Sequence, residues 1–196
     1  SMTAYFMQEL ILEPYAGLVF GFTPGESTML SAAQNGGVFL GMLLVGIAAT
    51  GLRLGSLRSW VIAGCLGSAA SLAAIMLAGL LMQPAALMPA VVSLGLFNGM
   101  FAVAAIGTMM ALAGEGRGAR EGTRMGLWGA AQAIAAGFGG LLGAGAVDLM
   151  RVVLADDIAA FGGVFLAEAV LFALAAGLAA NVIHRRPARG AVIAGE

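Results

Sequence analysis

The arginine residues of this chain alternate strictly between long apolar runs, and this spacing constrains the fold more than any other feature. All nine Lys or Arg side chains are Arg, and eight lie in every second gap between the runs: Arg53, Arg58, Arg117, Arg120, Arg124, Arg185, Arg186 and Arg189. Only Arg151 lies in an alternate gap, where acidic residues offset it. Basic loops of membrane proteins face the cytoplasm. The pattern therefore predicts repeated membrane crossings with the Arg-rich loops inside.

The composition indicates that lipid is the main solvent. Apolar residues make up 61% of the chain and charged residues only 10%, whereas soluble domains have roughly 45–50% apolar and about 25% charged residues. A water-soluble protein this apolar could not cover its surface with polar groups. The net charge of −1 provides no basic field, which argues against a nucleic-acid-binding function.

Six apolar segments divide the chain, and each exceeds the roughly 20 residues needed to span a hydrocarbon core. We predict an all-α membrane protein, because a membrane helix satisfies its own backbone hydrogen bonds and the alternating polarity of a β-barrel strand is missing. The expected transmembrane helices cover residues 2–22, 27–52, 59–82, 85–113, 125–147 and 158–183, with 184–196 as a cytoplasmic tail. The acidic segment 148–157 is expected to be partly helical. Because the chain opens inside an apolar segment, we expect it to be part of a longer protein.

Two acidic side chains in the first segment are the main candidates for a site. Glu9 and Glu13 are four residues apart, so they share one face of a helix, and Gln8 is expected to widen the polar patch. Pro14 removes a backbone donor and weakens the helix next to them. The pair suits a proton, a cation or the central metal of a pigment. The alternative is that Glu13 is solvated at the membrane surface while Glu9 bonds a neighbouring helix.

Other polar residues at membrane depth are secondary candidates, because such groups normally face the bundle interior or a cavity. They are Gln34, Asn35, Asn98, Gln132 and Glu168. Each amide can contact a ligand or simply hydrogen-bond between helices. Glu168 can carry a proton or face a neighbouring helix as a neutral acid. The only His, His184, lies at the end of the last segment, so a pigment metal would need oxygen ligands, which suit Mg²⁺.

Pairs of Gly at helical spacing predict close helix packing. Gly37 and Gly41, Gly95 and Gly99, and Gly139 and Gly143 each place two Gly on one helix face, where another backbone can approach. No hydrolase triad, P-loop, zinc spacing or dinucleotide fingerprint occurs in a credible context. We therefore expect no catalytic activity and no free metal ion.

The sequence resembles two nested groups of membrane proteins. Six helices with basic inner loops resemble half of a twelve-helix transporter of the major facilitator superfamily, built from two similar halves. Residues 51–58 (GLRLGSLR) resemble its cytoplasmic Gly-and-Arg motif, without the usual acid. Three further stretches are similar to the PucC/LhaA family of phototrophic bacteria: MQELILEPYAG at 7–17, FNGM at 97–100 and REGTRMGLWGAAQA at 120–133. The resemblance implies that the chain is the C-terminal half of such a protein and that the N-terminal half is missing.

This resemblance implies a role in assembling light-harvesting complexes in the photosynthetic membrane. Family members are thought to deliver bacteriochlorophyll or chlorophyll to the α and β antenna polypeptides, beside the pigment-synthesising enzymes. Glu9 and Glu13 match the family's acid-bearing motif and would contact pigment or partner. The basic loop of Arg117, Arg120 and Arg124 would face the cytoplasm, where new antenna polypeptides arrive. Two alternatives remain: a proton-coupled transporter half using Glu9, Glu13 or Glu168, and a structural membrane subunit without pigment contact.

Overall fold

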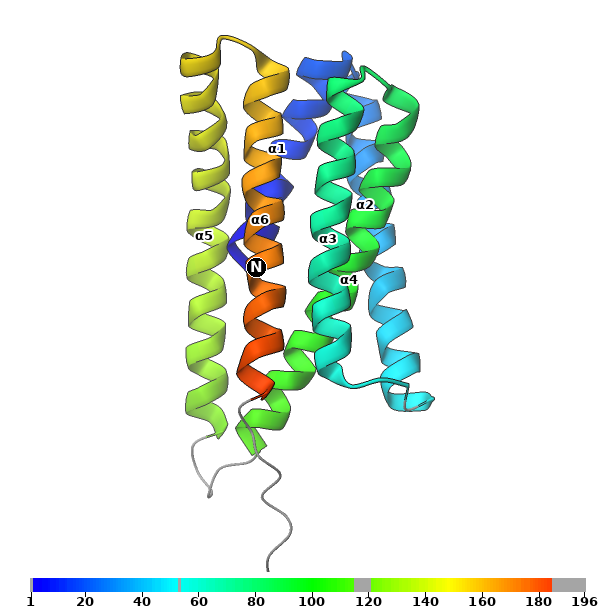
Figure 1. Cartoon of the computed structure of the whole chain (residues 1–196), viewed down its shortest axis with the longest axis vertical. Helices are drawn as coiled ribbons and strands as arrows, with labels where there is room; N and C mark the ends of the chain where they lie inside the picture. Colours follow the sequence, from blue (N-terminus) through cyan, green and yellow to red (C-terminus); the bar gives the residue numbers. More distant parts are fainter. Residues whose placement is uncertain (1, 53, 115–120, 185–196) are drawn as a thin grey trace, which may run out of the picture.

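The fold is a bundle of six α-helices in a computed structural model that describes residues 2–52, 54–114 and 121–184 (Figure 1). The helices are α1 (Met2–Phe20), α2 (Pro24–Val45), α3 (Leu57–Leu80), α4 (Pro84–Gly114), α5 (Glu121–Leu154) and α6 (Asp157–His184). A π-helical turn, Gly46–Gly51, extends α2. The described residues contain no strand. The predicted all-α membrane class is therefore confirmed.

Five helices, α2 to α6, are long and apolar enough to cross a membrane. The helix α1 is not among them, although a transmembrane helix was predicted there. Its 19 residues correspond to about 28 Å at 1.5 Å per residue, but they include Glu9, Glu13 and Pro14. The polar side chains lower the hydropathy of α1 relative to its neighbours.

The helices lie antiparallel to their sequence neighbours, so loops gather at two opposite ends of the bundle (Figure 1). The helix α3 packs against both α4 and α6, α2 packs mainly on α4, and α1 packs mainly on α5. The α1–α2, α3–α4 and α5–α6 connections lie at one end. The alternation of the Arg residues in the sequence corresponds to this alternation of the two ends.

An aromatic cluster joins α1 to α6 and α3. The ring of Tyr15 lies 5.5 Å from that of Phe161 and 4.9 Å from that of Phe165. Its hydroxyl donates a 2.8 Å hydrogen bond to the carbonyl of Ile75 on α3. Tyr15 is 1% exposed, so this buried hydroxyl needs the partner that α3 supplies. The cluster fixes the side of α1 that faces the bundle interior.

Reciprocal glycine contacts hold α2 against α4. A Cβ on Gly37 would lie 2.5 Å from the carbonyl oxygen of Val92, and one on Gly41 would meet the carbonyl of Leu96. In return, Gly95 and Gly99 face the carbonyls of Gln34 and Val38 (each of these contacts is with backbone). Only Gly lets two helix backbones come this close. The predicted packing role of these two glycine pairs is confirmed.

The third glycine pair packs α5 on α1. A Cβ on Gly139 would lie 3.1 Å from the carbonyl oxygen of Thr3, and one on Gly143 would lie 3.0 Å from that of Met7. These contacts are looser than those between α2 and α4, so a neighbour could move by a few tenths of an ångström. The predicted tight packing is confirmed here too.

Several predicted helix ends differ from the structure by two or more residues. The first helix ends at Phe20 rather than at 22, and the second begins at Pro24 rather than at 27. Thr23 caps the second helix in a capping box with Glu26, and Pro24 occupies its first turn. This Thr-Pro-Gly-Glu pattern is a helix-start signal, so the predicted start at 27 was too late.

The fifth helix was expected to end at 147 but continues to Leu154. Helical hydrogen bonds extend through the acidic segment, which is partly helical as predicted. The ion pair between the Arg151 Nε and the Asp157 Oδ1, 2.6 Å long, then bridges the turn to α6. Charged residues here end the apolar pattern but not the helix, because helix propensity does not require burial.

Candidate functional site

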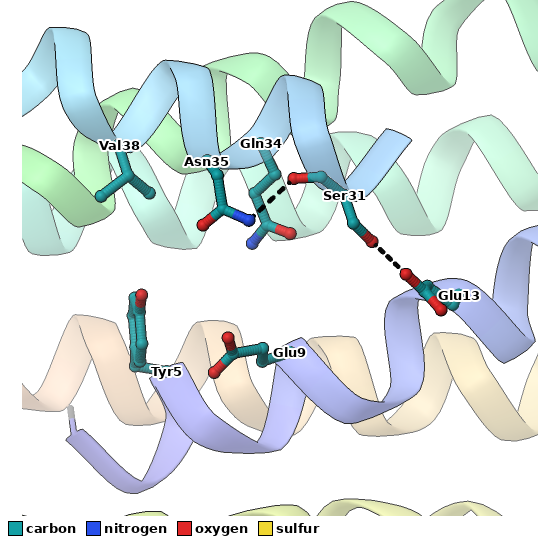
Figure 2. Close-up of a pocket in the computed structure, with 7 residues that line it drawn as sticks. All are labelled: Tyr5, Glu9, Glu13, Ser31, Gln34, Asn35 and Val38. Atoms are coloured by element: carbon teal, nitrogen blue, oxygen red, sulfur yellow. Dashed lines mark hydrogen bonds between the residues drawn. The ribbon is translucent and has the colours of Figure 1, made fainter. Parts of the chain in front are cut away.

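A polar cleft lies between α1 and α2 (Figure 2). Its volume is about 150 Å³, and its lining residues are Tyr5, Glu9, Glu13, Ser31, Gln34, Asn35 and Val38. Only two of these side chains, Tyr5 and Val38, are mainly apolar. The cleft brings together four of the residues that the sequence singled out.

Helical periodicity on both sides builds the cleft. On α1, Tyr5, Glu9 and Glu13 recur every four residues, which places them on one face. On α2, Ser31, Gln34 or Asn35, and Val38 follow the same spacing. The opposite face of α1 carries the buried stripe that includes Ile11 and Tyr15. Packing of that stripe turns the two carboxylates towards α2.

Hydrogen bonds close one end of the cleft and leave the other open. The Ser31 hydroxyl donates a 2.6 Å hydrogen bond to the Glu13 carboxylate, which joins α2 to α1. The Asn35 amide donates a 3.0 Å bond back to the Ser31 carbonyl. The Glu9 carboxylate accepts no hydrogen bond from the described residues. Glu9 is thus the acid available to bind something else.

The donor set suits a hard cation or a hydrogen-bond donor. Carboxylate and amide oxygens from Glu9, Glu13, Gln34 and Asn35 are the ligand type that Mg²⁺ prefers, and none of the described lining residues is cationic. The described residues contain no group of three or more His, Cys, Asp or Glu that could hold a metal ion. The cleft can therefore offer a metal one or two oxygen ligands rather than a complete cage.

The volume limits what the cleft can enclose. At about 150 Å³ it is half the lower end of the roughly 300–1,000 Å³ range of drug-sized ligand pockets. A tetrapyrrole ring could not be enclosed. The cleft can hold the polar edge or the metal-bound oxygen of a larger ligand whose remainder lies outside it.

The prediction that Gln8 widens this polar patch is wrong. Gln8 is 1% exposed and points into the bundle with the buried stripe of α1, not into the cleft. Consecutive helix residues are turned by about 100°, so Gln8 and Glu9 lie on different sides of α1. The packing of α1 against α5 and α6 decided which of them reached the cleft.

The remaining candidates lie away from the cleft. Asn98 is buried in α4 and accepts a 2.8 Å hydrogen bond from the Ser68 hydroxyl of α3, which is the interhelical role that the sequence left open. Glu168 is fully buried in α6. Gln132 is half-buried on α5 and lines no part of the cleft. The structure therefore divides the polar candidates between one cleft and the bundle interior.

Three lining residues were missed from the sequence, the apolar Val38 and the hydroxyl-bearing Ser31 and Tyr5. Ser31 precedes Asn35 by one helical turn, and Tyr5 precedes Glu9 by one turn. Both follow from extending the two candidate faces by four residues. The signal was available, but Ser and Tyr are too common in membrane helices to stand out unless the facing helix is known.

Of the predicted cytoplasmic Arg residues, the structure places the side chain of Arg58. It donates a hydrogen bond to the carbonyl of Ala180, which ties the start of α3 to the last turns of α6. Arg53, Arg117, Arg120 and the tail at 185–196 lie outside the described residues, as does the side chain of Arg124.

Known proteins resemble this chain along its whole length. The family described as PUCC protein matches residues 1–187. The bacteriochlorophyll synthase 44.5 kDa chain of Rhodobacter capsulatus is 68% identical over all of this chain and 46% of its own length. Protein PucC of the same organism is 30% identical over 91% of this chain and 39% of its own length.

A third relative, the uncharacterized protein in the puhA-bchM intergenic region of Rhodobacter capsulatus, is 32% identical over 75% of this chain and 30% of its own length. No solved structure matches the chain. The chain spans about half the length, or less, of the curated relatives it matches. The family match covers nearly all of the sequence, so the chain belongs to the PUCC protein family.

Proposed function

We propose that this chain is part of a membrane-embedded assembly factor that binds bacteriochlorophyll, chlorophyll or a late precursor and passes it to light-harvesting polypeptides. Membership of the PUCC protein family and the bacteriochlorophyll-related name of a 68% identical relative support this reading. The observation that carries it is the Glu9 carboxylate, which accepts no hydrogen bond from the described residues and lies in a cleft whose other polar groups are oxygen-rich.

The surface beside the cleft suits a flat apolar ligand. From Asn35, the outer face of α2 continues through Phe39 and Met42, which are 61% and 38% exposed. Their spacing of four and three residues keeps them on one stripe. A pigment ring lying along this stripe would bury apolar surface at roughly 25 cal/mol per Å². Glu9 and Gln34 would then receive the polar edge or a metal-bound water.

The function proposed is binding and transfer without chemical change. In this proposal the chain works beside the enzymes of pigment synthesis and does not itself catalyse a reaction. The cargo pigment brings its own metal, so the cleft needs to supply only oxygen contacts. Newly made α and β antenna polypeptides and the pigment-synthesising enzymes would be the protein partners.

The proposed location is the photosynthetic inner membrane, with the C-terminus in the cytoplasm. The Arg-rich loops would lie on the cytoplasmic side, where antenna polypeptides emerge. The part of the longer relatives that this chain does not cover would complete the bundle. Lipid would cover the remaining apolar faces.

The experiment that tests this function is an absorption spectrum of the full-length protein purified in mild detergent from a pigment-producing host. We expect a near-infrared chlorin band at a fixed ratio to protein. The band should be lost in a Glu9→Gln, Glu13→Gln double variant. Asp148→Asn is the matched control, because Asp148 is an exposed acid on α5 outside the cleft.

Other outcomes would favour the two alternatives. A colourless protein that still purifies with antenna polypeptides would indicate a structural subunit. A colourless protein that loses solute accumulation when Glu168 is changed to Gln would indicate proton-coupled transport, an alternative favoured by the burial of this acid in the membrane region.

A further inference from the structure

Two buried polar side chains, Gln8 and Glu168, take no part in the cleft. They are 1% and 0% exposed, on α1 and α6. Both side-chain atoms of Gln8 and both carboxylate oxygens of Glu168 lack a hydrogen-bond partner among the described residues. A buried polar atom left unpaired costs about 1–3 kcal/mol. Four such atoms on two neighbouring helices would destabilise the bundle unless they pair.

The aromatic cluster places these two residues within about one helical turn of each other along the bundle. Tyr15 on α1 contacts Phe161 and Phe165 on α6. Gln8 lies two turns before Tyr15, and Glu168 lies one turn after Phe165. Because α1 and α6 run antiparallel, both steps lead in the same direction along the bundle. Gln8 lies on the same face of α1 as Tyr15, and Glu168 lies on the same face of α6 as Phe165.

No cation among the described residues can neutralise Glu168. Arg58 binds the carbonyl of Ala180, about 18 Å further along α6 at 1.5 Å per residue. Arg151 pairs with Asp157, about 16 Å away in the other direction by the same rise. The ionisable side chains on the helices packed against this part of α6 are Tyr5, Glu9, Glu13, Tyr15 and Cys65. All of these are acids, so none favours an ionised Glu168.

We propose that Glu168 holds a proton and forms a cyclic acid–amide pair with Gln8. The carboxylic O–H would donate to the Gln8 carbonyl oxygen, and the Gln8 amide would donate to the other Glu168 oxygen. Both side chains are long and rotate about several torsions. This single arrangement pairs all four atoms, and it requires the neutral acid. An ionised carboxylate could accept the amide hydrogen but would face the amide oxygen without a donor.

The pair is a positioning device for the cleft. Gln8 and Glu9 are consecutive, so fixing the rotation of Gln8 towards α6 turns Glu9 towards α2. Pro14 weakens α1 two turns further on, which makes an added restraint on its rotation useful. The assignment of a proton to Glu168 rests on the packing of α1 and α6 and does not depend on the proposed pigment function.

Cross-linking tests whether Gln8 and Glu168 face each other. In a Cys65→Ala background of the full chain in membranes, we expect Gln8→Cys with Glu168→Cys to be joined by a short bifunctional thiol reagent, because two long side chains separate their Cα atoms further than a direct disulfide spans. Glu9→Cys with Glu168→Cys is the matched control and should not be joined. Equal cross-linking of both pairs, or none with Gln8→Cys, would overturn the proposal.

Infrared spectroscopy tests the proton. We expect a carbonyl band of a protonated carboxylic acid at neutral pH, absent in Glu168→Gln and shifted in Gln8→Met, which keeps the volume but loses the amide. Asp148→Asn should leave the band unchanged. Glu168→Gln can still pair amide with amide, so it should fold. The acid–amide pair would be contradicted if the unmodified protein lacked the band. It would also be contradicted if Gln8→Met left the frequency of the band unchanged.

Discussion

The hydroxyl of Ser31 lies 2.6 Å from the carboxylate of Glu13 and donates a hydrogen bond to it across the α1–α2 interface. Among the described residues, this bond is the side-chain link between the two walls of the cleft. It satisfies one of the two acids and leaves Glu9 available. The first prediction concerns this link.

Changing Ser31 to Ala should free Glu13 and loosen the cleft. A hydrogen bond to a charged group contributes about 1.5–3 kcal/mol when buried, but Glu13 is exposed, so we expect a loss of stability below about 1 kcal/mol. Pigment retention should fall more clearly than stability. Thermal unfolding and the chlorin-to-protein ratio, measured on the same sample, check this.

Thr28→Ala is the control for this change, because Thr28 makes a similar hydroxyl bond within α2 only, to the carbonyl of Pro24. It should leave pigment retention unchanged. If both variants lose pigment equally, the Ser31–Glu13 bond has no specific role in the cleft.

Changing Gly99 to Ala should destabilise the bundle, because the added Cβ would meet the backbone carbonyl of Val38 on α2. Backbone cannot move aside as a flexible side chain can, so we expect a loss of about 1–3 kcal/mol, typical of overpacking. Unfolding in detergent, followed by circular dichroism, measures the effect.

Gly129→Ala on α5 is its matched control, since nothing lies within 4 Å of the added atom. That change should be neutral or stabilise the helix by up to about 1 kcal/mol through propensity. Similar losses for both variants would mean that the close approach of α2 and α4 is not what makes Gly99 necessary.

Changing Tyr15 to Phe should remove the hydrogen bond to the Ile75 carbonyl while keeping the ring contacts with α6. The buried carbonyl keeps its place in the α3 ladder, so we expect a loss of about 0.5–1.5 kcal/mol. Tyr5→Phe, on the half-buried ring that lines the cleft, should cost less stability. A larger loss from Tyr5→Phe would contradict the role given to Tyr15.

The two ends of the bundle should lie on opposite sides of the membrane. In a Cys65→Ala background, a Cys in place of Leu54, which is exposed between α2 and α3, should react with a membrane-impermeant thiol reagent only after the membrane is permeabilised. A Cys in place of Ala155, which is exposed in the α5–α6 turn, should react from the outside. The reverse pattern would show that the Arg-rich end of the bundle lies outside rather than on the cytoplasmic side.

Helix positions could largely be predicted from the sequence because their causes are local. Apolar length and the absence of polar partners in lipid require helices in these segments. The misjudged ends, at Pro24 and Leu154, lie in polar stretches where hydrophobicity carries no information and capping or continued propensity decides. The glycine pairs also indicated close packing, but not which helix approaches each pair.

The sequence by itself determined that the chain is an all-helical membrane protein and that Glu9 and Glu13 share a face of the first helix. Only the tertiary structure decided that this face meets Gln34 and Asn35 of α2 and that Gln8 turns the opposite way. Periodicity sets angles between residues on one helix. The absolute rotation of that helix depends on what packs against it, here the seating of Tyr15 among Phe161, Phe165 and α3.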